Sequence, residues 1–461
     1  MSFETIKDIV DFNPSRPLSK GKEFPFIDMA SLPVNGRDIN EVSNKVFNGG
    51  GAKFKNGDTL FARITPCLEN GKTAKVENLP VGCIAHGSTE FIVLSAKSKD
   101  DEDFVYYLAR LPDFRSYAIS RMEGTSGRQR VSWQALAEFN LRLPEKGKRK
   151  KIGKILKSLD DKIHLNNQIN QTLESIAQAI FKSWFIDFDP VRAKIAAKQE
   201  GKDPEFAAMC AISGKSEVEI QQMSDDDFIE LQATAALFPD ELVESELGEV
   251  PKGWNITKIA TVTASIFSGG TPSTKEETYW NGEIPWLSSG ETRNKIIVST
   301  EKSITETAVK KSSTKLAFFG DILIASAGQG HTRGQTSFNA IECYINQSIV
   351  ALRANDKVSP YWLYYCLEPR YDEMRSLSDS HSSRGSLTTK LLASMPVILP
   401  TKKLVVSFDK VIKSMLTQQV KNLKETKILK ETRDALIPKL LSGDLDISDL
   451  VSETEYEYSA E

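Results

Sequence analysis

The sequence predicts an α+β protein in which two homologous domains are separated by two long antiparallel coiled-coil-like helices, with pseudo-two-fold symmetry. Three observations predict this fold class. A set of motifs occurs twice in the same order, with an offset of about 256–263 residues. An apolar heptad pattern follows each copy. Each copy also mixes short β-rich runs with a few helical stretches and many turn residues, which is typical of an α+β domain.

The internal repeat is the most informative feature of the chain. Segment 54–62 contains Gly57-Asp58 and resembles segment 317–325, which contains Gly320-Asp321. Each Gly-Asp pair predicts a tight turn that leads into a strand. Other segments pair in the same order: 25–28 with 285–288, 90–94 with 347–351, and 105–108 with 363–366. A period this long indicates duplicated domains of ordinary size, and not a solenoid.

A long helix is predicted after each copy. In the first, one seam position recurs every seven residues, at Ile152, Leu159, Asn166, Leu173 and Ile180, and the second seam position holds Leu156, Ile163, Asn170, Ala177 and Trp184. The second helix repeats the pattern less regularly, with Phe408, Met415, Asn422, Leu429 and Leu436. The alternative interpretation is an ordinary helix pair inside one globular core.

Asn166 and Asn422 occupy matching seam positions near the middle of the two helices. A polar residue in an apolar seam costs stability but can fix the register of a helix pair. If the helices pair antiparallel, the two side chains should meet, which makes them candidate register residues. The alternative is two unrelated asparagines that face solvent.

Charge is distributed unevenly along the chain. The net charge is −3, but residues 199–249 carry 14 acidic and 2 basic side chains, and residues 444–461 carry 7 acidic side chains and none that is basic. The remaining residues therefore have a net charge of +16. A basic body suits contacts with phosphate groups, although charge alone is weak evidence for a nucleic-acid partner.

Several classes of protein do not fit this sequence. No apolar run approaches the roughly 18–20 residues of a transmembrane helix, and no secretory signal is visible at the start. The five cysteines are scattered without a Cys-x-x-Cys pair, which argues against a zinc site or a disulfide framework. The expected location is the cytoplasm.

The predicted organisation has six parts. They are a first domain (1–144), a central spacer helix (145–190), an acidic linker (191–250), a second domain (251–400), a C-terminal spacer helix (401–445) and an acidic flexible tail (446–461). The linker is expected to fold partly as helices near 216–231 or to remain flexible.

No catalytic centre is expected. The sequence lacks the Asn/Asp-Pro-Pro-aromatic motif with which adenine methyltransferases hold a flipped base, because Asn13-Pro14 continues with Ser15. Gly71-Lys72-Thr73 resembles the end of a P-loop, but Pro66 stands where that loop needs its first glycine. The four histidines lack the spacing of metal ligands, and no Gly-x-Ser-x-Gly elbow occurs.

Four segments resemble the conserved regions of Type I restriction–modification specificity subunits. They are 182–194 (KSWFIDFDPVRAK), 245–254 (SELGEVPKGW), 268–286, which opens with SGGTP, and 436–445 (LIPKLLSGDL). The resemblance runs along essentially the whole chain. The first domain departs from the pattern, because residues 1–12 carry no Pro-Lys-Gly-Trp entry.

The resemblance implies a non-catalytic subunit whose two target-recognition domains each read one half of an asymmetric bipartite DNA site. It implies two modification subunits that use S-adenosylmethionine to methylate adenine N6, and restriction subunits that use ATP and magnesium. No cofactor or metal is expected in this chain. The two-fold relation also fits DNA, which has local two-fold symmetry, and helices of about 35 residues would form a spacer of roughly 50 Å.

Polar loops supply the candidate DNA contacts, because Arg, Gln, Ser and Thr bond base edges while Lys and Arg bind phosphates. The candidates in the first domain are Arg63, Lys72, Arg128, Gln129 and Arg130. The candidates in the second domain are Gln329, Arg333, Gln335 and Arg384. Solvated loops without a DNA contact are the alternative for each residue. The basic run 148–151 fits either phosphate contacts or a merely solvated helix start.

Two other functions remain possible at this point. The chain could be the recognition half of a single-chain restriction–methylation protein, although the missing methyltransferase motif argues against that. It could also be a scaffold that holds protein partners through its helices without binding DNA.

Overall fold

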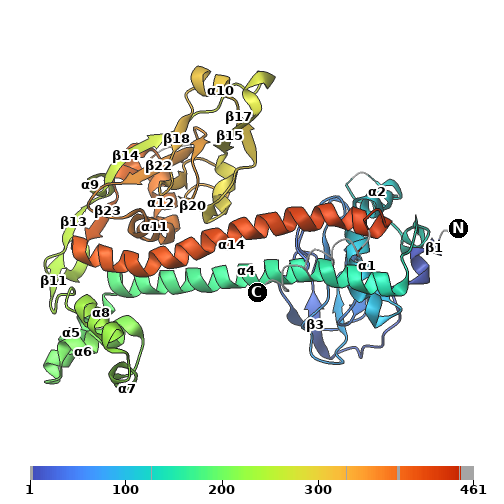
Figure 1. Cartoon of the computed structure of the whole chain (residues 1–461), viewed down its shortest axis with the longest axis horizontal. Helices are drawn as coiled ribbons and strands as arrows, with labels where there is room; N and C mark the ends of the chain where they lie inside the picture. Colours follow the sequence, from blue (N-terminus) through green and yellow to red (C-terminus); the bar gives the residue numbers. More distant parts are fainter. Residues whose placement is uncertain (1–3, 126, 329, 382–384, 446, 448–461) are drawn as a thin grey trace, which may run out of the picture. The chain divides into compact units, whose positions relative to one another are not determined.

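A computed structural model describes residues 4–125, 127–328, 330–381, 385–445 and 447. The chain forms two compact units. Unit 1 contains residues 1–166 and 425–461, and unit 2 contains residues 167–424. Each unit therefore combines one of the repeated domains with a part of both long helices (Figure 1).

The first repeat domain contains two four-stranded sheets. One has the order β2 (Val10–Phe12), β9 (Phe91–Ala96), β6 (Thr59–Ala62), β7 (Thr73–Lys75). The other has the order β4 (Ser43–Val46), β3 (Glu23–Ile27), β8 (Ala85–Gly87), β5 (Ala52–Phe54). A short pair joins β1 (Glu4–Thr5) to β10 (Asn140–Leu141), and the domain's helices are α1 (Glu102–Arg110), α2 (Pro112–Ser120) and α3 (Trp133–Ala137).

The second repeat domain repeats this topology and adds one edge strand to the first of its two sheets. Its sheets have the orders β14 (Thr263–Ser268), β22 (Ile349–Ala354), β19 (Ile322–Ala325), β20 (Thr336–Asn339), β16 (Ile296–Ile297), and β17 (Lys302–Ile304), β15 (Trp280–Leu287), β21 (Cys343–Ile345), β18 (Lys315–Ala317). The pair β13 (Asn255–Lys258) with β23 (Pro396–Leu399) matches β1 with β10. Its helices are α9 (Ile259–Val262), α10 (Glu306–Lys311), α11 (Pro360–Leu367), α12 (Tyr371–His381) and α13 (Thr389–Ser394). Because the parallel pairing of β3 with β8 recurs as that of β15 with β21, the predicted duplication is confirmed.

Strand pairing corrects one part of the predicted repeat alignment. Phe91 pairs with Ala62 in the first domain, and Ile349 pairs with Ala325 in the second. Phe91 therefore corresponds to Ile349, one residue beyond the position that the sequence alignment gave it. Both strands are continuous buried runs at this point, so their apolar pattern does not specify the register.

The repeated Gly-Asp pair forms the expected turn in both domains. Gly57 and Gly320 adopt φ angles of 93° and 88°, in the left-handed region that favours glycine. The following aspartates are buried, and each accepts a backbone N–H from three residues earlier at 2.8 Å. An arginine neutralises each carboxylate: Arg16 bonds Asp58, and Arg353 bonds Asp321.

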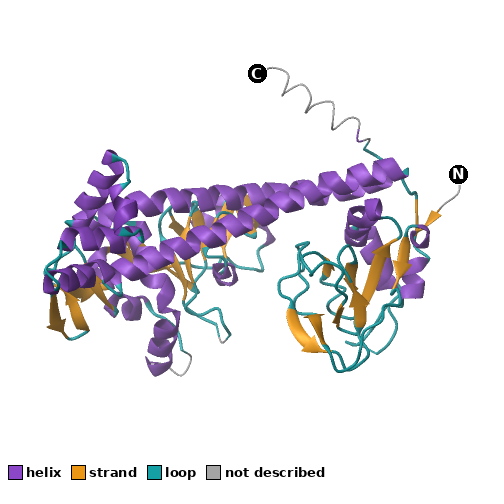
Figure 2. Ribbon diagram, turned by 90° about the horizontal axis from the view of Figure 1, so that it is seen from below, coloured by secondary structure: helices purple, strands orange, loops and turns teal. Residues whose placement is uncertain are grey.

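The two long helices are α4 (Lys146–Phe185) and α14 (Lys402–Ser442), which confirms the helices predicted from the heptads. They run side by side and antiparallel within each unit (Figure 1, Figure 2). In unit 1, Asp160 bonds Arg433 while Asn166 bonds Thr426. In unit 2, Asn170 bonds Asn422 while Glu174 bonds Gln419. The residue numbers of the bonded partners on α14 therefore decrease as those on α4 increase, as expected for antiparallel helices.

Both register candidates are buried, so the solvent-facing alternative is wrong. Asn166 donates to Glu425 at 2.8 Å and to Thr426 at 3.4 Å. Asn422 donates to Asn170 at 2.9 Å and accepts from Gln418 at 2.7 Å. The contact expected between Asn166 and Asn422 would join the two units, and it stays a prediction.

The acidic linker is mostly helical. It contains α5 (Asp189–Gln199), α6 (Pro204–Ser213), α7 (Glu217–Gln221) and α8 (Asp225–Ala235), followed by the hairpin β11 (Leu242–Ser245) and β12 (Gly248–Pro251). Buried Lys194 ties these elements together, because its ammonium donates to Glu205 at 2.7 Å and to the Phe238 carbonyl at 2.8 Å. The predicted flexible tail lies outside the described residues except for Ile447.

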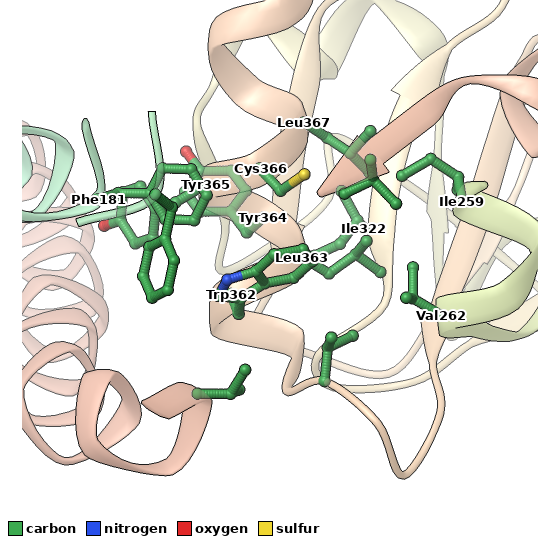
Figure 3. Close-up of a cluster of buried hydrophobic side chains, with 14 of the residues drawn as sticks. Phe181, Ile259, Val262, Ile322, Trp362, Leu363, Tyr364, Tyr365, Cys366 and Leu367 are labelled. Carbon is green, nitrogen blue, oxygen red and sulfur yellow. The ribbon is translucent and has the colours of Figure 1, made fainter. Parts of the chain in front are cut away.

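The core of unit 2 is rich in aromatic side chains. Figure 3 shows Phe181 of α4 beside Trp362 and Tyr365 of α11, with ring centres 6.1 and 6.3 Å apart. Aliphatic residues such as Ile259, Val262 and Ile322 continue this core into the sheet. Among the residues that the structure describes, no helix combines the length and the apolar character needed to cross a membrane.

Candidate DNA interface

The structure brings the two predicted loops of each domain together. In the first domain, Thr65 of the β6–β7 loop donates its backbone N–H to the Gln129 carbonyl at 3.1 Å. The backbone N–H of Val131 donates to the Arg63 carbonyl at 3.0 Å. In the second, Leu387 donates to Ser326 of the β19–β20 loop at 2.9 Å. Residues far apart in sequence thus form one polar surface per domain, as two loops on a rigid sheet often do in binding proteins.

Arg128, Gln129 and Arg130 have different environments. Arg130 forms a bidentate ion pair with Glu90, with nitrogen–oxygen distances of 2.8–3.0 Å, and also donates to the Arg128 carbonyl at 3.1 Å. The hydrogen bonds that Arg130 donates to the Glu90 carboxylate raise the pKa of Arg130 above its ordinary value. Gln129 is half-buried and is held by backbone bonds to Thr65, whereas Arg128 is exposed. Arg130 thereby fixes the loop that presents Arg128.

Lys72 and Arg63 lie at opposite ends of the β6–β7 loop. The Lys72 ammonium donates to the Met29 carbonyl at 2.7 Å, so it braces a neighbouring segment. Arg63 is half-buried, and its Nε lacks a hydrogen-bond partner. Among the residues that the structure describes, the Arg63 guanidinium has no ion-pair partner.

In the second domain, Arg333 points into the protein and is 7% exposed. Its guanidinium donates to the Gly385 carbonyl and forms an ion pair with Asp379 at 2.5 Å. It therefore joins the β19–β20 loop to the segment after α12. In this structure Arg333 is a positioning residue, and its predicted contact with DNA stays a prediction.

The other second-domain candidates are described only in part. Gln335 is half-buried and accepts a hydrogen bond from Thr292 at 3.4 Å. Gln329 and Arg384 lie outside the described residues, so their predicted roles stay predictions.

Two residues that support the second surface escaped the sequence analysis. Arg375 of α12 donates to the Gly330 carbonyl at 2.7 Å and to the Tyr371 hydroxyl at 3.1 Å. Tyr371 in turn donates to the His331 carbonyl at 2.9 Å. The signal that could have found them is their i, i+4 spacing, which places both side chains on one helix face.

The basic start of α4 is partly neutralised within unit 1. Arg149 pairs with Asp101 at 2.9 Å, and Lys150 pairs with Asp100 at 2.7 Å. These pairs favour a structural role for this run over free phosphate contacts. In the described part of the chain, no cluster of His, Cys, Asp or Glu has the geometry of a metal site.

Comparisons with known proteins agree with this architecture. The family model of the Type I restriction modification DNA specificity domain matches twice, over residues 3–175 and 251–432. The chain is 32% identical over 423 residues to the Type I restriction enzyme HindI specificity subunit of Haemophilus influenzae, covering 88% of this chain and 90% of that protein. It is 22% identical over 354 residues to the MjaIX specificity subunit of Methanocaldococcus jannaschii, covering 76% of this chain and 70% of that protein.

A solved structure shares the fold. The Type I restriction–modification S subunit from M. genitalium matches with a TM-score of 0.56 at 14% identity, covering 95% of this chain and 96% of that chain. The twofold match of the family model and the extent of the HindI similarity establish the family. This chain belongs to the specificity subunits of Type I restriction–modification systems, the non-catalytic components that recognise DNA.

Proposed function

We propose that the chain reads an asymmetric DNA site in two parts, one part with each repeat domain, and directs partner subunits to that site. The observation that carries this proposal is the pairing of one shared topology with two dissimilar loop surfaces. The first surface presents Arg128 beside the Arg130–Glu90 pair, whereas the second is built around buried Arg333. Different side chains at equivalent places bind different bases, so the two halves of the site should differ.

The chemistry belongs to the partners in this proposal. Two modification subunits would bind S-adenosylmethionine and methylate adenine N6, and restriction subunits would use ATP and magnesium to translocate and cut DNA. The chain itself would hold no cofactor and would act in the cytoplasm. The antiparallel helix pair supports this arrangement, because a stiff spacer fixes the gap between two half-sites.

The decisive experiment maps methylated adenines in the genome of a strain that expresses this chain with its modification subunits. The expected result is one motif with two different halves and a gap of constant length. Arg128→Ala should weaken binding by about 1–3 kcal/mol if Arg128 reads a base, and should relax one half of the motif alone. Lys99→Ala, which removes an exposed cation outside both loops, is the control and should leave the motif unchanged.

Other outcomes would contradict the proposal. A single continuous motif would rule out two separate half-sites. Methylation of DNA by the purified chain with S-adenosylmethionine would make it an enzyme. Modification subunits that bind the same sequence equally well without this chain would reduce it to a scaffold.

A further inference from the structure

A hollow in the first repeat domain adjoins the candidate DNA surface. It has a volume of about 440 Å³, and its polar lining includes Ser15, Arg16, Lys53, Arg63 and Thr89. Arg63 opens the β6–β7 loop, and Thr89 precedes Glu90, the partner of Arg130. The hollow therefore lies next to both loops that the sequence predicts to contact DNA.

Two cations of this hollow are not neutralised. Arg16 forms an ion pair with Asp58, so it stabilises the Gly57-Asp58 turn and adds little net charge to the hollow. Lys53 lies 5.3 Å from the centre of the Phe47 ring and, like Arg63, forms no ion pair with any described residue. The described lining contains no carboxylate. A half-buried site with two free cations favours an anion, and an Arg fork matches the geometry of phosphate.

The corresponding place in the second domain lacks both of these cations, although Lys315, at the position of Ala52, holds its ammonium 5.9 Å from the centre of the Phe267 ring. Strand pairing makes Ser326 the equivalent of Arg63 and Leu316 the equivalent of Lys53. Gly269 takes the place of Ser15, and a Cβ on it would lie 1.9 Å from the Ile345 carbonyl oxygen. This segment therefore packs tightly in the second domain, and the pair of Arg63 and Lys53 has no counterpart among the described residues of that domain.

We propose that this hollow binds a backbone phosphate of the DNA half-site read by the first domain, with Arg63 and Lys53 as its ligands. The inference rests on the proposed function. Phosphates project from the outside of the duplex and fit a concave site, whereas base edges lie at the floor of a groove and need a projecting side chain. The contact strengthens binding and fixes the position of the first domain without selecting a base.

The test measures DNA binding by the full chain with its modification subunits, on a duplex that carries the mapped target. Arg63→Gln and Lys53→Gln should each weaken binding about tenfold, for specific and mismatched duplexes alike. Each should also lower the slope of log K against log salt by about 0.9. Lys45→Gln is the matched control, because its ammonium also lies over a ring, 4.5 Å from the centre of Phe26, but outside the hollow.

Neutral methylphosphonates placed one at a time along the duplex locate the contact. One position in the first half-site should weaken the wild-type complex but not the Arg63→Gln complex, and no position in the second half-site should respond in this way. An unchanged salt slope in both variants overturns the proposal. A loss of binding that depends on the identity of a single base pair also overturns it. The proposal is also overturned if inorganic phosphate stabilises the wild-type chain alone while no methylphosphonate position weakens the complex. That result would instead show a site for a free anion.

Failure of the proposed function gives a different result. In that case the wild-type complex would bind the mapped target no better than a mismatched duplex. Neither variant would change that lack of preference. If Arg63→Gln does not fold, as judged by circular dichroism, Lys53→Gln carries the test alone, because Lys53 makes no hydrogen bond through its ammonium in the described structure.

Discussion

The two repeat domains share a topology but contact the long helices through different chemistry. In unit 1, the Tyr107 hydroxyl donates to Asp160 of α4 at 2.8 Å, and Asp160 pairs with Arg433 of α14 at 2.6 Å. Asp160 and Arg433 are only 4% and 2% exposed. In unit 2, rings from α4, α11 and α14 pack against one another, with Phe408 within 5.2–6.3 Å of Phe185, Phe181, Trp184 and Tyr365.

The equivalent tyrosines show where the internal symmetry ends. Tyr107 and Tyr365 occupy the same position of the repeat, and burial raises the pKa of both hydroxyls. A strict two-fold relation would direct Tyr365 to α14, but it donates to Glu174 of α4 at 3.2 Å. Duplication has thus kept the topology and a hydroxyl donor, while the acceptor and the surrounding packing have diverged.

The largest expected effect breaks the polar contact of unit 1. Arg433→Met should lower the free energy of unfolding by about 3–5 kcal/mol, because it leaves the Asp160 carboxylate buried without its cation. Asp160→Leu combined with Arg433→Met should recover most of that loss. Urea denaturation followed by circular dichroism measures both. If the single and the double variant lose equal free energy of unfolding, the ion pair does not stabilise the helix contact of unit 1.

The corresponding change in unit 2 should have a smaller effect. Phe408→Leu should lower the free energy of unfolding by about 2 kcal/mol, because it removes ring contacts and leaves a cavity but no unpaired charge. Val406→Ala on the same helix is the control, since Val406 is half exposed and its truncation should change stability by at most about 0.5 kcal/mol. A loss with Val406→Ala as large as that with Phe408→Leu would refute the role of the aromatic cluster.

A polar pair beside the aromatic cluster sharpens the comparison. Asn422→Leu should lower the free energy of unfolding by about 1–2 kcal/mol, because it leaves the half-buried Asn170 side-chain oxygen without a donor. Adding Asn170→Leu should restore stability but weaken the register of the helices. Spin labels on α4 and α14 would then show a broader distance distribution. An unchanged distance distribution would show that the Asn170–Asn422 pair does not set the register.

The smallest expected effect concerns pH and belongs to unit 2. Burial raises the pKa of Asp409 to about 6, from its ordinary value of 3.8, despite its hydrogen bond from Ser359. The folded state therefore binds more protons than the unfolded state between these values, so this group favours folding as pH falls through 6. Asp409→Asn should be more stable than wild type at pH 8, and the difference should shrink below pH 6. Parallel denaturation curves at each pH test this, and a constant difference would contradict it.

Sequence alone determined the duplication, both long helices and the paired Gly-Asp turns. These features depend on local rules: a seven-residue apolar period, a left-handed glycine and an order of motifs that repeats. The same analysis placed polar loops at equivalent positions of the two domains, because loops that follow equivalent strands in a duplicated domain lie in equivalent places, and the contact of these loops with DNA stays a prediction.

The tertiary structure alone decided the role of each polar side chain. Arg333 and Arg128 are both loop arginines, yet one is buried against Asp379 and the other is exposed. The one-residue correction between β9 and β22, the counter-ion Glu90 of Arg130 and the hollow beside Arg63 were likewise invisible in the sequence. Each depends on contacts between residues distant along the chain, and neither charge nor periodicity encodes which distant group a side chain will meet.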